Sequence, residues 1–166
     1  MKPKPKPLRA AADHVQAAPT FPSFRQVLYP LDEKSGAAVG ANDRPRLLIV
    51  EDDLLVAWQM EEALTDAGFT VTAVASSLEE ALQFADETQP RLVLMDIRLY
   101  GERDGVDAAL ELFRKHALRC LFTSAHTDYA VRKRAEPAQP VGWLPKPYTM
   151  SALVYAVREA LKTLGG

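Results

Sequence analysis

The sequence has little cysteine, no long apolar run and no strong excess of either charge, and each shortage argues against a class of protein. Cys120 is the only cysteine among 166 residues, so a disulfide framework is impossible and a reducing compartment is expected. The longest apolar runs are only a few residues long, which is too short to span a membrane. The formal charge of −2 argues against bulk nucleic-acid binding. We therefore expect a cytoplasmic protein that binds neither membranes nor nucleic acids.

The composition changes near residue 45. Residues 1–45 hold seven of the 12 prolines and carry seven Lys/Arg against four Asp/Glu, whereas the remainder carries thirteen against eighteen. The alternation of Lys and Pro over residues 2–7 is incompatible with helix and sheet and favours extended conformations. We interpret residues 1–45 as a proline-rich, largely flexible arm and residues 46–166 as one folded domain.

One part of this arm has a helical pattern. Phe21, Phe24 and Leu28 are spaced so that they share one face of a helix. The spacing predicts a short amphipathic helix over residues 22–29, limited by Pro30. A helix of this length is marginal by itself in water. Two interpretations stay open, namely a mostly disordered arm and an arm that docks on a surface or forms a homodimer.

The folded part alternates strand and helix patterns. The expected strands are 46–50, 70–74, 91–95, 118–122 and 141–144, and the expected helices are 54–67, 77–88, 104–116, 127–135 and 149–164. Runs such as RLLIV and RLVLM are apolar at almost every position, which is typical of parallel strands buried on both faces. Repeated strand–helix units predict a doubly wound α/β fold with a five-stranded parallel sheet.

Polar residues follow several of these strands. Residues 51–53 (EDD) follow the first strand, Asp96 the third, Thr123 and Ser124 the fourth, and Lys146 the fifth. The carboxyl ends of parallel strands meet at one edge of the sheet, where ligands bind. Carboxylates that converge there need a cation between them, and oxygen ligands favour Mg²⁺ or Mn²⁺. A lysine and a hydroxyl would stabilise a phosphoryl group, so we expect Asp96 to act as a nucleophile that accepts one.

Five stretches together resemble the receiver domain of bacterial two-component response regulators, which has a flavodoxin-like fold. They are LLIVEDD (47–53), LVLMDIRL (92–99), DG (104–105), FTSAH (122–126) and GWLPKPY (142–148). The resemblance implies a stand-alone, single-domain response regulator. Such a protein takes a phosphoryl group from a histidine kinase or a histidine phosphotransferase and then changes its protein contacts. It acts as a switch rather than as a metabolic enzyme.

The resemblance also implies a role for each site residue. The implied ligands of the metal are Glu51, Asp52, Asp96 and the backbone carbonyl of Arg98, with Asp53 as a variable third acidic residue. The implied residues of phosphorylation and switching are Asp96 as phosphoacceptor, Lys146, Ser124 as switch hydroxyl with Thr123 as the alternative, and Trp143 as switch aromatic. Arg98 and His126 stand at positions that tune the lifetime of the phosphoryl group, and the bond from Lys146 to Pro147 is expected to be cis.

Partner binding is expected at the first helix of the domain. Trp58 falls on the side of that helix opposite its apolar stripe, which makes it a candidate docking anchor. A partner helix bundle and the Phe21, Phe24 and Leu28 face of the arm are the two candidate occupants. The competing functions are an unphosphorylated pseudo-receiver scaffold and a phosphate sink or relay intermediate. A phosphatase is disfavoured because Arg98 stands where that chemistry needs a second acid.

Overall fold

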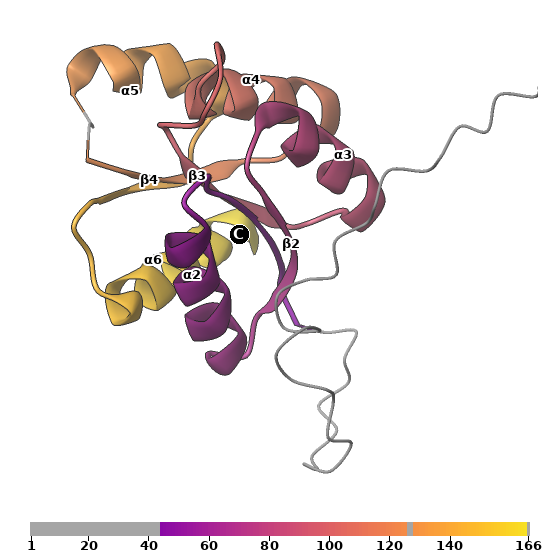
Figure 1. Ribbon diagram of the computed structural model, residues 1–166, viewed down its shortest axis with the longest axis vertical. Coiled ribbons are helices and arrows are strands. Elements are labelled where there is room, and N and C mark those ends of the chain that lie inside the picture. The colour runs from indigo at the N-terminus through magenta and orange to yellow at the C-terminus, as the bar shows by residue number, and fades with distance from the viewer. Residues whose placement is uncertain (1–43, 126–127, 166) are drawn as a thin grey trace, which may run out of the picture. The chain divides into compact units, whose positions relative to one another are not determined.

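The computed structural model describes residues 44–125 and 128–165, and in these two ranges five parallel strands form one sheet. The order across the sheet is β2-β1-β3-β4-β5. The strands are β1 (Arg46–Val50), β2 (Thr70–Ala75), β3 (Leu92–Asp96), β4 (Cys120–Ser124) and β5 (Gly142–Pro145). The helices are α2 (Leu54–Asp66), α3 (Leu78–Thr88), α4 (Gly105–His116), α5 (Tyr129–Ala135), η1 (Glu136–Ala138) and α6 (Met150–Gly165). This confirms the predicted doubly wound, flavodoxin-like architecture (Figure 1).

The strand β3 lies at the centre of the sheet, between β1 and β4, and all of its residues are buried. Successive side chains of β1 and β3 enter opposite cores, as strand geometry requires. Leu48 and Val93 belong to one core, and Leu47 and Leu92 belong to the other. Both faces of the sheet therefore exclude water, which explains why these strands are apolar without alternation.

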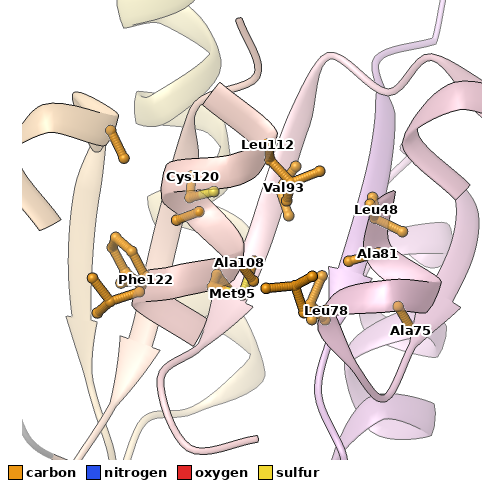
Figure 2. Packing of buried hydrophobic residues seen from close by; sticks show 14 of the residues in the cluster. Leu48, Ala75, Leu78, Ala81, Val93, Met95, Ala108, Leu112, Cys120 and Phe122 are labelled. Carbon is orange, nitrogen blue, oxygen red and sulfur yellow. The ribbon is translucent and has the colours of Figure 1, made fainter. Parts of the chain in front are cut away.

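Helices cover the two faces unequally. The helices α3, α4 and α5 lie on one face, and α2 and α6 lie on the other (Figure 1). Figure 2 shows the first core, to which Met95 of β3, Phe122 of β4 and Leu112 of α4 all contribute. Met60 of α2 and Leu153 of α6 close the second core. Full burial of one such side chain stabilises the fold by about 1.5–3 kcal/mol.

Capping residues fix where the helices begin. Ser77 caps α3 and accepts a hydrogen bond from the amide of Glu80 at 3.2 Å, while Ser76 donates to the carboxylate of Glu80 at 2.9 Å. Asp104 caps α4 and forms a capping box with Asp107. These caps satisfy amides that have no partner within the helix. The helices α3 and α4 therefore begin at Leu78 and Gly105, one residue after the expected starts.

Four strands reach further along the chain than the apolar runs predict, and β2 ends at Ala75, one residue beyond its expected bound. The strands β3, β4 and β5 end at Asp96, Ser124 and Pro145, one or two residues beyond the expected bounds. The parallel ladder continues there, because Asp96 pairs with Thr123 and Ser124 pairs with Pro145. Polar residues can thus belong to a buried strand. Asp96 and Ser124 are held by the sheet rather than by a loop.

The helix α5 is short, and Pro137 and Pro140 follow it in the sequence. It spans seven residues and is followed directly by η1, which contains Pro137. Its N-cap is Asp128, whose side chain accepts a hydrogen bond from the amide of Val131. The predicted arm helix at 22–29, with Phe21, Phe24 and Leu28, and the tuning residue His126 lie outside the described residues.

Candidate functional site

Three carboxylates meet at the carboxyl edge of the sheet. Glu51 follows β1 directly, Asp52 is the next residue, and Asp96 ends the neighbouring strand β3. One carboxylate oxygen from each residue lies within 4.8 Å of the others. Glu51 is 2% exposed and Asp96 is 7% exposed, so two of these charges are largely withdrawn from water. Such an arrangement is costly unless positive charge compensates it.

Lys146, which follows β5, supplies one compensating charge. Its Nζ lies 2.8 Å from Oε2 of Glu51 and 2.7 Å from Oδ2 of Asp96. The ammonium therefore joins the ends of three strands by two charge-assisted hydrogen bonds. A single lysine balances only one of the three carboxylates, so the cluster keeps an excess of negative charge.

Backbone amides hold the remaining oxygens of the two buried carboxylates. The amide of Arg98 donates to Oδ1 of Asp96 at 3.3 Å, and the amide of Asp53 donates to Oε1 of Glu51 at 3.4 Å. Each carboxylate is thus held at one oxygen by Lys146 and at the other by a backbone N–H. The orientation of both groups follows from the backbone path immediately after β1 and β3.

Burial and charge shift the proton affinities of the cluster. Burial, followed by the negative charge of Asp96, raises the pKa of Glu51, although the hydrogen bond from Lys146 opposes this. Burial disfavours the ammonium of Lys146, yet its hydrogen bonds to Asp96 and Glu51 outweigh burial and raise its pKa above the usual range. Lys146 therefore stays charged at neutral pH, and the cluster favours an added cation.

The donor set fits a hard divalent cation. Every candidate ligand in the cluster is a carboxylate oxygen, which is the donor that Mg²⁺, Mn²⁺ and Ca²⁺ prefer. The described residues place no cysteine or histidine among these oxygens, so the site does not resemble a zinc centre. This geometry is consistent with the prediction that one acidic site contains Glu51, Asp52 and Asp96. The backbone carbonyl of Arg98 stays a prediction.

The two hydroxyl residues at the end of β4 face opposite sides of the sheet. Both are buried, Thr123 at 0% and Ser124 at 1% exposure. Alternation along the strand puts Ser124 on the same face as Phe122, which lies in the core beneath α4 and α5. Trp143 packs against that same core. Ser124, rather than Thr123, therefore lies on the face of the sheet that carries Trp143, and the role of Ser124 as switch hydroxyl stays a prediction.

Residues 47–158 match the family described as the response regulator receiver domain. The chain belongs to this family. The transcriptional regulatory protein PdtaR of Mycobacterium tuberculosis is 32% identical over 116 residues, which are 70% of this chain and 56% of PdtaR. The phyllosphere-induced regulator PhyR of Methylorubrum extorquens is 29% identical, over 75% of this chain and 47% of PhyR. The chain thus spans about half the length of these relatives.

Solved receiver structures have the same fold. The signal receiver domain of a modulated diguanylate cyclase from Desulfovibrio desulfuricans G20 is 32% identical, with a TM-score of 0.68, and the match covers 74% of this chain and 98% of that one. The response regulator PhyR from Brucella abortus is 26% identical, with a TM-score of 0.61, over 72% of this chain and 49% of that chain. The protein is therefore a receiver domain of two-component signalling. Of the helices that the structure describes, none has the length and apolar character needed to cross a membrane.

The aromatic residue of β5 is packed rather than free in this receiver domain. The ring of Trp143 stacks on Phe122, with centroids 4.5 Å apart and planes 18° apart. The guanidinium carbon of Arg132 lies 5.0 Å from the centroid of the Trp143 ring. Three residues further along the chain, Lys146 reaches the acidic cluster, and its bond to Pro147 is cis, as the family resemblance implies.

A steric constraint explains the glycine of the DG stretch at residues 104–105. The amide of Gly105 donates to the carbonyl of Ile97 at 2.8 Å, which brings the start of α4 against the end of β3. A Cβ atom on Gly105 would lie 1.8 Å from the backbone oxygen of Asp96. No side chain fits in that space. Glycine is required here because α4 begins directly against the backbone of the predicted phosphoacceptor.

Asp53 has a role that the family resemblance does not assign. It is the N-cap of α2, and its Oδ1 accepts hydrogen bonds from the amides of Leu55 at 2.9 Å and Val56 at 3.1 Å. It does not belong to the group of carboxylates that could hold a metal ion. An aspartate directly before a helical pattern is a capping signal, and this rule could have identified it from sequence.

Apolar side chains border the acidic site. The pocket over the carboxylates is also lined by Leu54, Leu55 and Tyr100. Leu54 is 67% exposed, and Trp58, one turn further along α2, is 37% exposed. The predicted outward position of Trp58 agrees with the structure, and Leu54 is exposed on the same helix. Their role in docking stays a prediction.

Proposed function

We propose that Asp96 accepts a phosphoryl group from the phosphohistidine of a histidine kinase or a histidine phosphotransferase. The observation that carries this proposal is the setting of the Asp96 carboxylate. It ends the central strand, touches Lys146 and the amide of Arg98, and lies beside Glu51 and Asp52. Membership of the receiver family supports the same reaction.

In the proposed step, a carboxylate oxygen of Asp96 forms a bond to phosphorus. The bond from phosphorus to the donor imidazole nitrogen breaks, the imidazole keeps the electron pair, and that nitrogen then takes a proton from solvent. The products are an aspartyl phosphate and a neutral histidine. Lys146 is already within hydrogen-bonding distance of Asp96 and would move its contact to a phosphoryl oxygen.

A divalent cation, which we propose to be Mg²⁺ or Mn²⁺, would be held by Glu51, Asp52 and Asp96. When bound, it offsets the charge of the carboxylates and of the phosphoryl oxygens. The chain itself supplies the fixed geometry, because Glu51 and Asp96 are each held by a backbone amide. The carbonyl of Arg98 is a further proposed ligand, and the side chains of Arg98 and His126 are proposed to tune how fast water removes the phosphoryl group.

We propose that the readout begins at Ser124. Its hydroxyl would donate a hydrogen bond to a phosphoryl oxygen, and Trp143, which packs against the same core, would change its position in response. This makes the domain a switch for protein contacts rather than a metabolic enzyme. A phosphate sink, a relay intermediate and an unphosphorylated scaffold are the alternatives. The scaffold is disfavoured because every acidic, hydroxyl and lysine position is present.

The proposed docking surface for the phosphodonor is the exposed face of α2 formed by Leu54 and Trp58. It adjoins the pocket that leads to Asp96. Tryptophan is enriched among the residues that anchor protein interfaces. Because its proposed partners act in the cytoplasm, we propose a cytoplasmic location for this protein.

Incubation with Mg²⁺ and acetyl phosphate tests the proposed function. We expect intact-mass measurement to show the gain of one phosphoryl group that depends on Mg²⁺ and is absent in Asp96→Asn. Asp53→Asn is the matched control, because it removes a nearby carboxylate outside the cluster and keeps the capping oxygen. A wild-type chain that gains no phosphoryl group from acetyl phosphate or from a histidine phosphotransferase would contradict the proposal and favour the scaffold.

A further inference from the structure

The short helix α5 has few buried side chains of its own. In its seven residues only Ala135 is buried, and Val131 is partly buried against the neighbouring core. A helix of two turns is unstable in water without tertiary contacts. Its place on the sheet must therefore depend strongly on the polar side chains that reach from it to other elements.

Arg132 reaches toward β5. Its guanidinium carbon lies 5.0 Å from the centroid of the Trp143 ring, within the range of a cation–π interaction. The same residue also stacks on Phe122, with ring centroids 4.5 Å apart. The indole thus contacts both the core residue and the arginine, and any movement of the ring changes the contact with α5.

Arg134 reaches in another direction, toward the start of α4. It donates a hydrogen bond to Oδ2 of Asp104, the N-cap residue of that helix. Burial disfavours the charge of Asp104, but the hydrogen bond from Arg134 and those from the backbone outweigh it and lower the pKa of this carboxyl. Asp104 directly precedes Gly105, which touches the backbone of Asp96. Arg134 therefore connects α5 to the segment that follows the phosphoacceptor.

The two arginines are two positions apart, so helical geometry separates their Cα–Cβ directions by about 200°. One side of α5 is held by the switch aromatic and the other side by the connection between β3 and α4. We propose that Arg132 and Arg134 form a two-sided latch, through which α5 responds both to the position of Trp143 and to the conformation of the β3–α4 connection. The latch itself does not require phosphorylation, whereas its response to a phosphoryl group rests on the proposed function.

Hydrogen exchange of the α5 amides in the full chain tests the latch. We expect Arg132→Gln and Arg134→Gln each to speed exchange over residues 129–135 by about two- to five-fold, the effect of losing one exposed cation–π contact or ion pair. Lys133→Gln is the matched control. It removes the same charge from the position between the two arginines and is expected to leave exchange in α5 unchanged.

Trp143→Leu separates the contact from a general effect of charge. We expect it to speed exchange in α5 as much as Arg132→Gln does, and the double variant to add nothing further, because both changes remove one contact. Arg132→Lys, which keeps the charge but loses the planar group, is expected to fall between the wild type and Arg132→Gln. Equal acceleration in Lys133→Gln, no acceleration in either arginine variant, or additive effects of Arg132→Gln and Trp143→Leu would each overturn the latch.

The phosphorylated protein gives a second measurement. With acetyl phosphate and Mg²⁺, and with phosphorylation followed by mass, we expect faster exchange in α5 of the wild type and a smaller change in Arg132→Gln. Phosphorylation that leaves exchange in α5 unchanged would overturn the proposed response to the phosphoryl group. If no phosphoryl group is gained, the proposed function fails, while the order of the variants in the unmodified protein still decides whether the latch exists.

Discussion

Two regions of the domain are built in different ways. The acidic half consists of Glu51, Asp52, Asp96 and Lys146, and the α5 half consists of Trp143 and the helix α5. Glu51 and Asp96 are buried, belong to or follow central strands, and are held by a lysine and by backbone amides. Trp143 and α5 lie at the side of the sheet and are held by arginine side chains and a stacked ring. The first half fixes the atoms for which the proposed phosphoryl transfer needs a fixed geometry. The second half is held by weaker contacts, which is where a change of state costs least.

The largest expected effect concerns the fixed half. Gly105→Ala would place a methyl group 1.8 Å from the backbone oxygen of Asp96, and neither partner can move without displacing α4 or β3. We expect a loss of about 3 kcal/mol or more in the free energy of unfolding, in the range of severe core disruption. Chemical denaturation measures it.

Gly142→Ala is the control for this variant. Its new methyl group would also be close to another atom, at 2.9 Å, but that atom is the end of the flexible Leu121 side chain. We expect it to cost much less than Gly105→Ala. Equal losses would mean that the close approach of α4 to Asp96 is not what requires glycine.

Lys146→Met tests how far the cluster depends on its internal cation. The change leaves Glu51 and Asp96 facing each other without the ammonium. Breaking a buried pair usually costs about 3–5 kcal/mol, and because Lys146 keeps 26% exposure we expect about 1–3 kcal/mol in metal-free buffer. Added Mg²⁺ should restore most of this loss. Lys133→Met should show neither the loss nor the recovery, and a Lys146→Met loss that Mg²⁺ leaves unchanged would contradict a cation site at the carboxylates.

Asp53→Ala distinguishes a capping residue from a metal ligand. It removes the acceptor for the amides of Leu55 and Val56, so we expect a loss of about 1 kcal/mol in stability. Asp53→Asn keeps that acceptor, so its loss of stability should be only a few tenths of the loss expected for Asp53→Ala. Calorimetric titration should give nearly the same Mg²⁺ affinity for both variants, whereas a large loss of affinity in either would make Asp53 a ligand.

The smallest effect belongs to the α5 half. The pKa of Asp104 is lowered in the folded protein, so its charge stabilises the fold above its unfolded pKa of about 3.9, and this contribution is lost as the pH falls through the lower folded value. Asp104→Asn keeps a capping oxygen but loses the charged pair with Arg134. We expect it to cost less than about 1 kcal/mol at neutral pH, because the pair is partly exposed.

Denaturation at several pH values measures this difference between the wild type and Asp104→Asn. The difference should shrink as the medium becomes more acidic, since the protonated wild-type side chain then resembles the neutral amide. A difference that grows on acidification would mean that the pair with Arg134 does not stabilise the fold.

Much of the fold and of the acidic site could be predicted from sequence. Fully apolar strands identify a sheet that is covered on both faces. The carboxyl ends of parallel strands bring Glu51, Asp96 and Lys146 together, and this does not depend on the conformation of the loops. The ends of the strands are harder to predict, because Asp96 and Ser124 are polar and still pair with the neighbouring strand. Polarity marks the end of an apolar run and not the end of hydrogen bonding between strands.

The contacts of α5 could not be predicted in the same way. Arg132 and Arg134 stand in a basic run that reads as a solvated surface, and nothing local shows that one reaches Trp143 and the other Asp104. The contacts of long side chains depend on how the helices and strands pack against one another. The periodicity of the sequence does not reveal that packing. The capping role of Asp53 follows from its place directly before a helical pattern, whereas the family resemblance assigns it no such role.

The two hydrogen bonds of Lys146 have a consequence for the order in which the molecule becomes competent. They join residues that lie 95 and 50 positions apart along the chain. During synthesis the first carboxylates therefore emerge long before the ammonium that pairs with them. A nascent chain that has formed β1 and β3 but not yet β5 holds the acidic residues without their counter-charge. The proposed phosphoacceptor can gain its complete surroundings only after the last strand has joined the sheet. A complete site is therefore found only in a domain whose sheet has finished forming.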